Sequence, residues 1–183
     1  MRKSIVGKFV KDIELKLVSE LMKNSRRSDR ELAKTLKVSQ PTVTRIRTRL
    51  EKEGLVNEYT MIPDFSKLDF SMMSITFARL KEPISEQKLK EVRKQVRQTL
   101  QTEPIATILG MGGMGLDSDR VIMAFHENFS AYTEHLDKLK QHPLVKVEEI
   151  KSFLIDLTDR SQYLQLTLSE LADYITYNKL HKN

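Results

Sequence analysis

The sequence predicts an α+β protein in which a small basic helical domain precedes a larger domain of four strands and two helices, followed by a helical extension. Three observations lead to this prediction. Apolar residues recur with the helical period over residues 12–50, whereas alternating strand-like segments and helical stripes follow one another over residues 71–157. The charge is divided in the same way, because residues 1–62 carry a net charge of +7 and residues 63–183 carry −1. A basic part that meets a polyanion, joined to a near-neutral part with another task, explains this division.

The composition excludes several classes of protein. Of the 183 residues, 39% are apolar and 31% are charged, which suffices for a buried core and argues against a disordered chain. Cysteine is absent, so disulfides, zinc–thiolate sites and cysteine nucleophiles are excluded. We see no metal-ligand spacing, signal peptide or membrane-spanning run. We therefore expect a cytoplasmic protein with no cofactor, no metal and no membrane contact.

Three helices are expected in the basic part. The first is expected to be capped by Asp12, and Ser28-Asp29-Arg30-Glu31 forms a capping box for the second. The third is capped by Ser39, buries an apolar stripe of Val43, Ile46 and Leu50, and stops at Gly54. Residues 56–62 then alternate as a strand. This order predicts a winged helix-turn-helix over residues 1–62.

The third helix leaves a polar face outward, and such side chains reach base edges when a helix enters a major groove. Arginines around the start of the second helix are placed for phosphate contacts. A polar outer face also occurs in helical domains that bind no DNA, and Arg47 lies beside the apolar stripe, where it is expected to extend along the surface rather than contact DNA. The predicted DNA-binding residues are Arg26, Arg27, Ser28, Arg30, Ser39, Gln40, Thr42, Thr44, Arg45, Thr48 and Arg49.

Residues 71–157, after a linker over 63–70, are expected in the order strand, helix, strand, strand, helix, strand. Two β-α-β units of this kind form a ferredoxin-like sheet with both helices on one side. We expect Met73, Ile75 and Phe77 to face the helices. The small or mildly apolar residues Met72, Ser74, Thr76 and Ala78 would then face the other side, against a second copy of the chain.

A glycine-rich segment, residues 110–115, holds four of the six glycines and matches the dinucleotide pattern G-x-G-x-x-G. That pattern requires a helix after the glycines, whereas a second strand is expected here, so a phosphate site is rejected. The segment is expected to be a loop between strands over 105–109 and 119–125. It is either a simple hairpin connection or a segment that becomes ordered when a ligand or neighbouring subunit packs on it.

The residues of both domains resemble the leucine-responsive regulator/AsnC family. The resemblance rests on Ser39-Gln40-Pro41-Thr42-Val43-Thr44-Arg45, on Leu50-Glu51-Lys52-Glu53-Gly54-Leu55-Val56, and on Tyr59-Thr60-Met61-Ile62-Pro63-Asp64-Phe65. It implies a sequence-specific transcriptional regulator, not an enzyme, that binds double-stranded DNA as a homodimer or larger homo-oligomer. It also implies a small effector such as an amino acid. The residues expected near that effector are Gly112, Gly113, Gly115, Asp117 and Asp119.

Three alternatives stay open at this point. The MarR regulators share the first two segments but have a longer basic hairpin as the wing. Siroheme decarboxylases resemble the same two-domain architecture and are enzymes, and a module that binds a protein rather than DNA is a third class.

Residues 158–183 extend beyond the usual end of the family. Thr167 and Glu170 suggest a capping box for a helix ending near Leu180, which would cover either the sheet or an oligomer contact.

Overall fold

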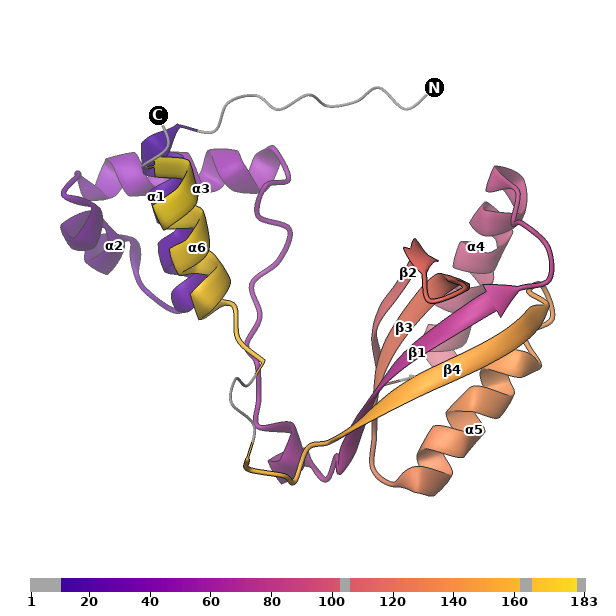
Figure 1. Ribbon diagram of the computed structural model, residues 1–183. Helices are drawn as coiled ribbons and strands as arrows, with labels where there is room; N and C mark the ends of the chain where they lie inside the picture. Colours follow the sequence, from indigo (N-terminus) through magenta and orange to yellow (C-terminus); the bar gives the residue numbers. More distant parts are fainter. Residues whose placement is uncertain (1–10, 103–105, 162–165, 181–183) are drawn as a thin grey trace. The chain divides into compact units, whose positions relative to one another are not determined.

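The computed structural model describes residues 11–102, 106–161 and 166–180, and it divides the chain into two compact units. The first unit combines residues 1–63 with the C-terminal residues 163–183, and the second spans residues 64–162. Each unit is shown in Figure 1. None of the described helices is long and apolar enough to cross a membrane.

Four helices build the first unit: α1 (Asp12–Lys23), α2 (Asp29–Leu36), α3 (Gln40–Lys52) and α6 (Ser169–Leu180). The Ser28 hydroxyl accepts a hydrogen bond from the Glu31 amide, and the Ser28 amide donates to the Glu31 carboxylate at 2.7 Å, so the predicted capping box is present. Gly54 follows α3 with a φ of +72°, as expected for the residue that ends the helix.

The core of this unit is the apolar stripe that the helical period predicts. Leu17, Leu32 and Leu50 are almost fully buried, and each contributes about 1.5–3 kcal/mol when removed from water. Val43 and Ile46 join them from α3. With these side chains buried beneath it, α3 has its polar face outward.

The expected strand over residues 56–62 is absent. The segment between α3 and the short 3₁₀ helix η1 (Phe65–Leu68) contains no strand. An extended segment becomes a strand only when a neighbour supplies hydrogen bonds, and the described residues of this unit provide no such neighbour. The segment is instead attached through the Tyr59 side chain and the Thr60 carbonyl. Tyr59 donates to Glu51 at 2.7 Å, and the Ser25 hydroxyl donates to the Thr60 carbonyl at 3.3 Å.

The second unit is the predicted ferredoxin-like domain. Its elements are β1 (Met72–Leu80), α4 (Glu86–Thr102), β2 (Thr107–Gly115), β3 (Ser118–His126), α5 (Phe129–Lys140) and β4 (Val147–Asp156). The strands are antiparallel in the order β2-β3-β1-β4, and α4 and α5 lie on the same side of the sheet (Figure 1). The expected first residue of β2, Ile105, lies outside the described residues.

The two faces of β1 are reversed relative to the prediction. Ser74, Thr76 and Ala78 are buried on the helix side, where the Ser74 hydroxyl contacts His126 Nε2 at 2.8 Å and His126 packs against Tyr132 of α5. Small side chains on β1 leave room for these rings, so the helices approach on that side. Ile75 and Phe77 therefore belong to the opposite face, together with their register partners Phe153 and Val121.

We call that opposite side the open face. Large apolar side chains occupy it, and Phe153 and Met111 are 66% and 57% exposed. One end is covered by η1, where the Phe65 ring stacks on Phe125 with centroids 3.9 Å apart. Residues 64–70 thus belong to the second unit rather than to a free linker.

The glycine-rich segment is a strand, not a loop. β2 continues through Gly115 and pairs with β3, whose backbone supplies the hydrogen bonds that a loop prediction ignores. The hairpin turn is confined to Leu116 and Asp117, with φ values of 53° and 55°. A two-residue turn with both central residues at positive φ matches the twist of the flanking strands.

Candidate nucleic-acid interface

The outer face of α3 and the start of α2 bring the predicted DNA-binding residues together within the first unit. Gln40, Arg45 and Thr48 are exposed on α3, and Arg26 and Arg30 are exposed at the start of α2. Among the described residues, none of these five side chains has a hydrogen-bond or ion-pair partner. We call them the unpaired set. Their donors are available to a ligand without breaking an internal contact.

Two of the predicted arginines form ion pairs with carboxylates of the same unit. Arg49 forms an ion pair with Glu14 of α1, and Arg27 forms one with Glu20 of α1 and also donates to Thr35. The Glu14 side chain is only 9% exposed, so Arg49 neutralises a nearly buried carboxylate. These two arginines fix α1 against α2 and α3.

Four hydroxyl residues of the predicted site have structural partners. Ser28 and Ser39 cap α2 and α3, and Thr42 contacts the Ser39 hydroxyl at 2.8 Å. The Thr44 hydroxyl donates to Asp29 at 2.6 Å. Their first role is to shape the beginnings of α2 and α3.

Asp29 was missed by sequence reasoning, although it determines how α2 and α3 meet. Its carboxylate accepts from Thr44 of α3 and lies 3.1 Å from Nη1 of Arg47. Arg47 also donates to the Arg27 carbonyl at 3.2 Å and lies 5.8 Å from the Tyr59 ring centroid. The expectation that Arg47 stays on the protein surface agrees with these contacts. Only the fold brings positions 29, 44 and 47 together, so spacing gave no signal.

Burial and its hydrogen bond to Glu51 raise the pKa of Tyr59 to about 12. Tyr59 therefore stays a protonated donor at neutral pH. This bond attaches residues 56–62 to the C-terminal part of α3.

The C-terminal helix α6 lies against α1 of the same unit. Ala172 is completely buried, its carbonyl accepts from the Ser19 hydroxyl at 2.9 Å, and Thr176 donates to the Ser19 hydroxyl at 2.8 Å. Lys23 Nζ lies 2.5 Å from Asp173 Oδ1, and the hydrogen bond to Asp173 raises the pKa of Lys23. The extension covers neither the sheet nor, by this face, an oligomer contact. It completes the first unit.

The predicted effector residues lie at the end of β2 and in the hairpin after it. The Asp117 carboxylate forms an ion pair with Arg79, whose guanidinium also contacts Glu148 and Glu149 at 3.2 and 3.1 Å. The Asp119 carboxylate accepts from the Leu80 amide at 3.2 Å. Both carboxylates therefore have partners already. Gly112 and Gly113 lie on β2, and Gly115 has a φ of +139°.

Comparison with known proteins first identifies the class of the N-terminal domain. Residues 11–57 match the family described as winged helix-turn-helix DNA-binding. The first unit is therefore a winged helix-turn-helix domain, carried on a chain with a ferredoxin-like second unit.

The relatives that the chain matches are named as HTH-type transcriptional regulators. HTH-type transcriptional regulator LrpC of Bacillus subtilis is 39% identical over 69 residues, which are 38% of this chain and 48% of LrpC. An HTH-type transcriptional regulator of Pyrococcus abyssi is 29% identical over 148 residues, 78% of this chain and 95% of that protein. The chain thus spans about half of LrpC and nearly all of the Pyrococcus protein.

Solved structures extend the similarity to both units. The crystal structure of PH0061 superposes with a TM-score of 0.68 at 21% identity, over 88% of this chain and 99% of that one. Bacillus subtilis LrpC gives 0.61 at 24% identity, over 83% and 96%. A Neisseria meningitidis regulator in complex with L-Met gives 0.65 at 15% identity, over 88% and 98%. In domain order and fold, the chain is therefore similar to regulators of the leucine-responsive/AsnC type, in line with the resemblance seen in the sequence.

Proposed function

We propose that the chain is a transcriptional regulator that reads a specific DNA sequence through α3. The observation that carries this proposal is the unpaired set, in which Arg45 and Thr48 lie near the middle of the exposed side of a helix anchored by Val43, Ile46 and Leu50. Arginine in this position suits guanine, and the hydroxyl of Thr48 suits either base or phosphate. Arg26 and Arg30 would contact phosphates and fix the register of the domain on the duplex.

The open face supports binding as a homodimer or larger assembly. Ile75, Phe77, Met123 and Phe153 form a contiguous apolar surface by strand register, and such surfaces on antiparallel sheets are normally covered. A second copy packed face to face would cover it and leave α4 and α5 on the outside. Two DNA-binding units would then be presented together.

An amino-acid effector is the finer part of the proposal. The relative from Neisseria meningitidis has been crystallised with L-Met. In this chain an ammonium group near the hairpin would compete with Arg79 for Asp117, and effector binding would in that way rearrange the ion pairs between the hairpin and β4. Gly112→Ala/Gly113→Ala tests this idea, because a Cβ meets nothing closer than 3.4 Å at Gly112 and nothing within 4 Å at Gly113.

That double variant should keep DNA binding but lose the change in affinity or assembly size that an amino acid from a panel produces. Gly110→Ala is the matched control, since a Cβ there also meets nothing within 4 Å. Sedimentation and DNA binding give both readouts. If the double variant responds as the wild type does, the glycines have no part in effector binding.

The proposed function itself is tested by selecting bound duplexes from a random pool with the full-length protein. A dimer with two recognition helices should enrich a pseudo-palindromic motif whose half-sites are spaced by about 10 base pairs or a multiple of that. Enrichment of no motif at all would contradict sequence-specific regulation. A motif with a single half-site, bound by a stable monomer, would contradict the dimeric part alone.

A further inference from the structure

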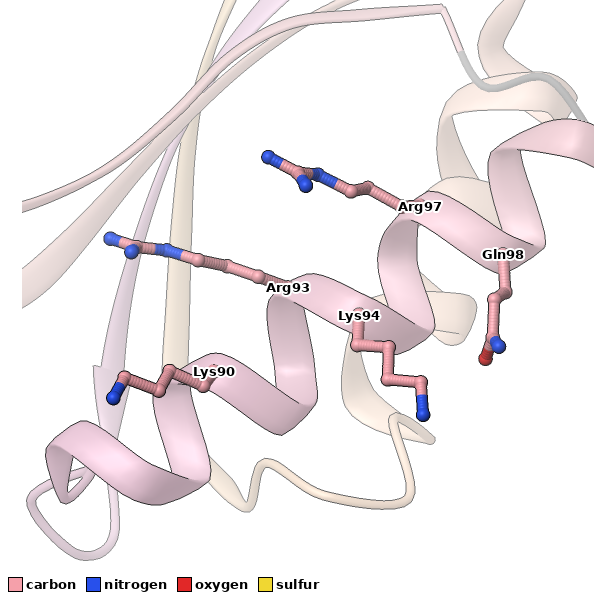
Figure 2. A pocket seen from close by; sticks show the side chains of 5 residues that line it. All are labelled: Lys90, Arg93, Lys94, Arg97 and Gln98. Carbon is pink, nitrogen blue, oxygen red and sulfur yellow. The ribbon is translucent and has the colours of Figure 1, made fainter.

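A second cationic surface lies on α4 of the ferredoxin-like unit, on a different unit from the recognition helix. Lys90, Arg93, Lys94 and Arg97 line an open hollow of about 390 Å³ together with Gln98 (Figure 2). We call these four cations the α4 patch. The spacing i, i+3, i+4, i+7 places all four on one side of the helix. Figure 2 shows Lys90, Arg93 and Arg97 extending the same way from the helix, while Lys94 and Gln98 point elsewhere.

The α4 patch has no internal electrostatic role. All four side chains are exposed, and none forms an ion pair with any carboxylate among the described residues. Elsewhere in this unit, cations such as Arg79 and Lys151 do pair with neighbouring glutamates. Four unpaired like charges within about two helical turns repel one another, so the patch is destabilising unless an external anion meets it.

The net charge of α4 is opposite in sign to the net charge of the residues around it in sequence. α4 carries a net charge of +3, whereas the rest of residues 63–183 sums to −4. The patch thus stands out as a local positive surface on an otherwise acidic part of the chain. Binding of an extended polyanion explains this clustering of positive charge better than a contribution to solubility does.

From these observations we propose that the α4 patch binds the phosphate backbone of duplex DNA outside the segment read by α3. The proposal rests on the proposed DNA-binding function and adds a second contact surface to it. Lys90 and Arg97 lie about 10 Å apart along the helix, given a rise of 1.5 Å per residue, a length that covers two or three successive phosphates. The donors are charged and hydrogen-bonding, and no apolar side chain lines the hollow. This chemistry fits a phosphate backbone better than a lipid bilayer or an apolar peptide.

The location agrees with this use. The large apolar residues of the sheet lie on the open face, whereas α4 lies on the other side. A dimer formed through the open face would therefore leave the α4 patch accessible. A short duplex would be held by the winged domains alone, and a longer one would also have flanking phosphates available for the patch.

The test compares DNA of two lengths. Wild-type protein and Lys90→Gln/Arg93→Gln/Lys94→Gln/Arg97→Gln are titrated against random duplexes of about 20 and about 80 base pairs, from about 50 to 200 mM salt. Glutamine keeps helix propensity, and circular dichroism checks that the variant is folded. The matched control, Lys81→Gln/Lys140→Gln/Lys146→Gln/Arg160→Gln, removes four charges from the same unit at dispersed positions.

We expect the patch variant to bind the long duplex at least tenfold more weakly than the control does, with the salt slope reduced by about 2, corresponding to two lost phosphate contacts. On the short duplex the two variants should agree within about twofold. If both variants bind the long duplex equally well, the α4 patch does not bind DNA. This is also the result expected if the partner of the patch is an acidic protein. Binding of the short duplex then leaves the proposed function intact. Failure of the wild type to bind the long duplex would also overturn the patch, whereas the proposed function is decided by the enrichment of a motif.

Discussion

The Ser19 hydroxyl on α1 donates a hydrogen bond of 2.9 Å to the carbonyl of Ala172 on α6, across 153 positions of the chain. This contact shows that the C-terminal extension belongs to the DNA-binding unit. The chain leaves that unit after residue 63 and returns to it at residue 163, so the ferredoxin-like unit is an insertion with two covalent connections to its neighbour. A change in the second unit thus has two routes to the first.

Replacing Ala172 with leucine should displace α6 from α1. Ala172 is fully buried, and a larger side chain in a packed contact typically costs about 1–3 kcal/mol in the free energy of unfolding. Thermal denaturation measures the loss, and hydrogen exchange should show α1 and α6 becoming less protected together. Tyr174→Leu, at a position 63% exposed on the same helix, is the control. Equal stability of the two variants would show that α6 is not docked.

Asp29→Ala should weaken the contact between α2 and α3. It removes the acceptor of Thr44 and the partner of Arg47, and losing a hydrogen bond to a charged group costs roughly 1.5–3 kcal/mol. Sequence discrimination should fall as well, because α3 loses its positioning on α2. We would measure the ratio of specific to random DNA binding, with Asp12→Ala, an exposed first-turn aspartate of α1, as the control. An unchanged ratio would leave Asp29 with a role in stability only.

Acid should destabilise the ferredoxin-like unit through His126. Burial under α5, together with the nearby His135, lowers the pKa of His126 to about 4, whereas an exposed histidine titrates near 6.5. The unfolded chain therefore binds the proton more strongly between these values, so the free energy of unfolding is highest above pH 6.5 and falls as the pH drops toward 4. Between pH 6.5 and 4, the free energy of unfolding should fall by a total on the order of 1–3 kcal/mol.

Denaturant unfolding at a series of pH values measures this dependence. His126→Gln retains a side-chain polar group for Ser74 but does not titrate, so its stability should change less between pH 6.5 and 4. His135 also has a lowered pKa because of its burial, and it contributes a smaller dependence that remains in the variant. Identical pH profiles for wild type and variant would exclude His126 as the source.

Much of the fold could be predicted because local signals agree with the tertiary structure. The capping box of Ser28 and Glu31 depends only on neighbours in sequence, as does the stop at Gly54. The face of β1 that the helices cover was predicted wrongly. Side chains alternate regularly between the two faces of the strand, and only the bulk of Tyr132 and His126 decides which face the helices cover. The strand pairing of β2 depends likewise on a partner that local composition does not reveal.

The candidate interface was predictable as a surface but not residue by residue. Nothing in the spacing distinguishes Arg45, which has no partner among the described residues, from Arg49, which pairs with Glu14 some 35 positions earlier. Ion pairs of this kind arise only when the helices pack. Of the eleven predicted residues, the five of the unpaired set are those whose side chains have no internal partner among the described residues, and DNA contact by any of the eleven stays a prediction.

The most direct test of sequence reading by α3 compares Arg45→Ala with Arg49→Ala on the enriched motif and on random DNA. Arg45→Ala should cost about 1–3 kcal/mol on the motif, roughly fivefold to 150-fold in affinity, with little effect on random DNA. Arg49→Ala should lower the stability of the unit, because it leaves the carboxylate of Glu14 unpaired, and should reduce both affinities alike. A loss for Arg45→Ala that is equal on the motif and on random DNA would contradict the account.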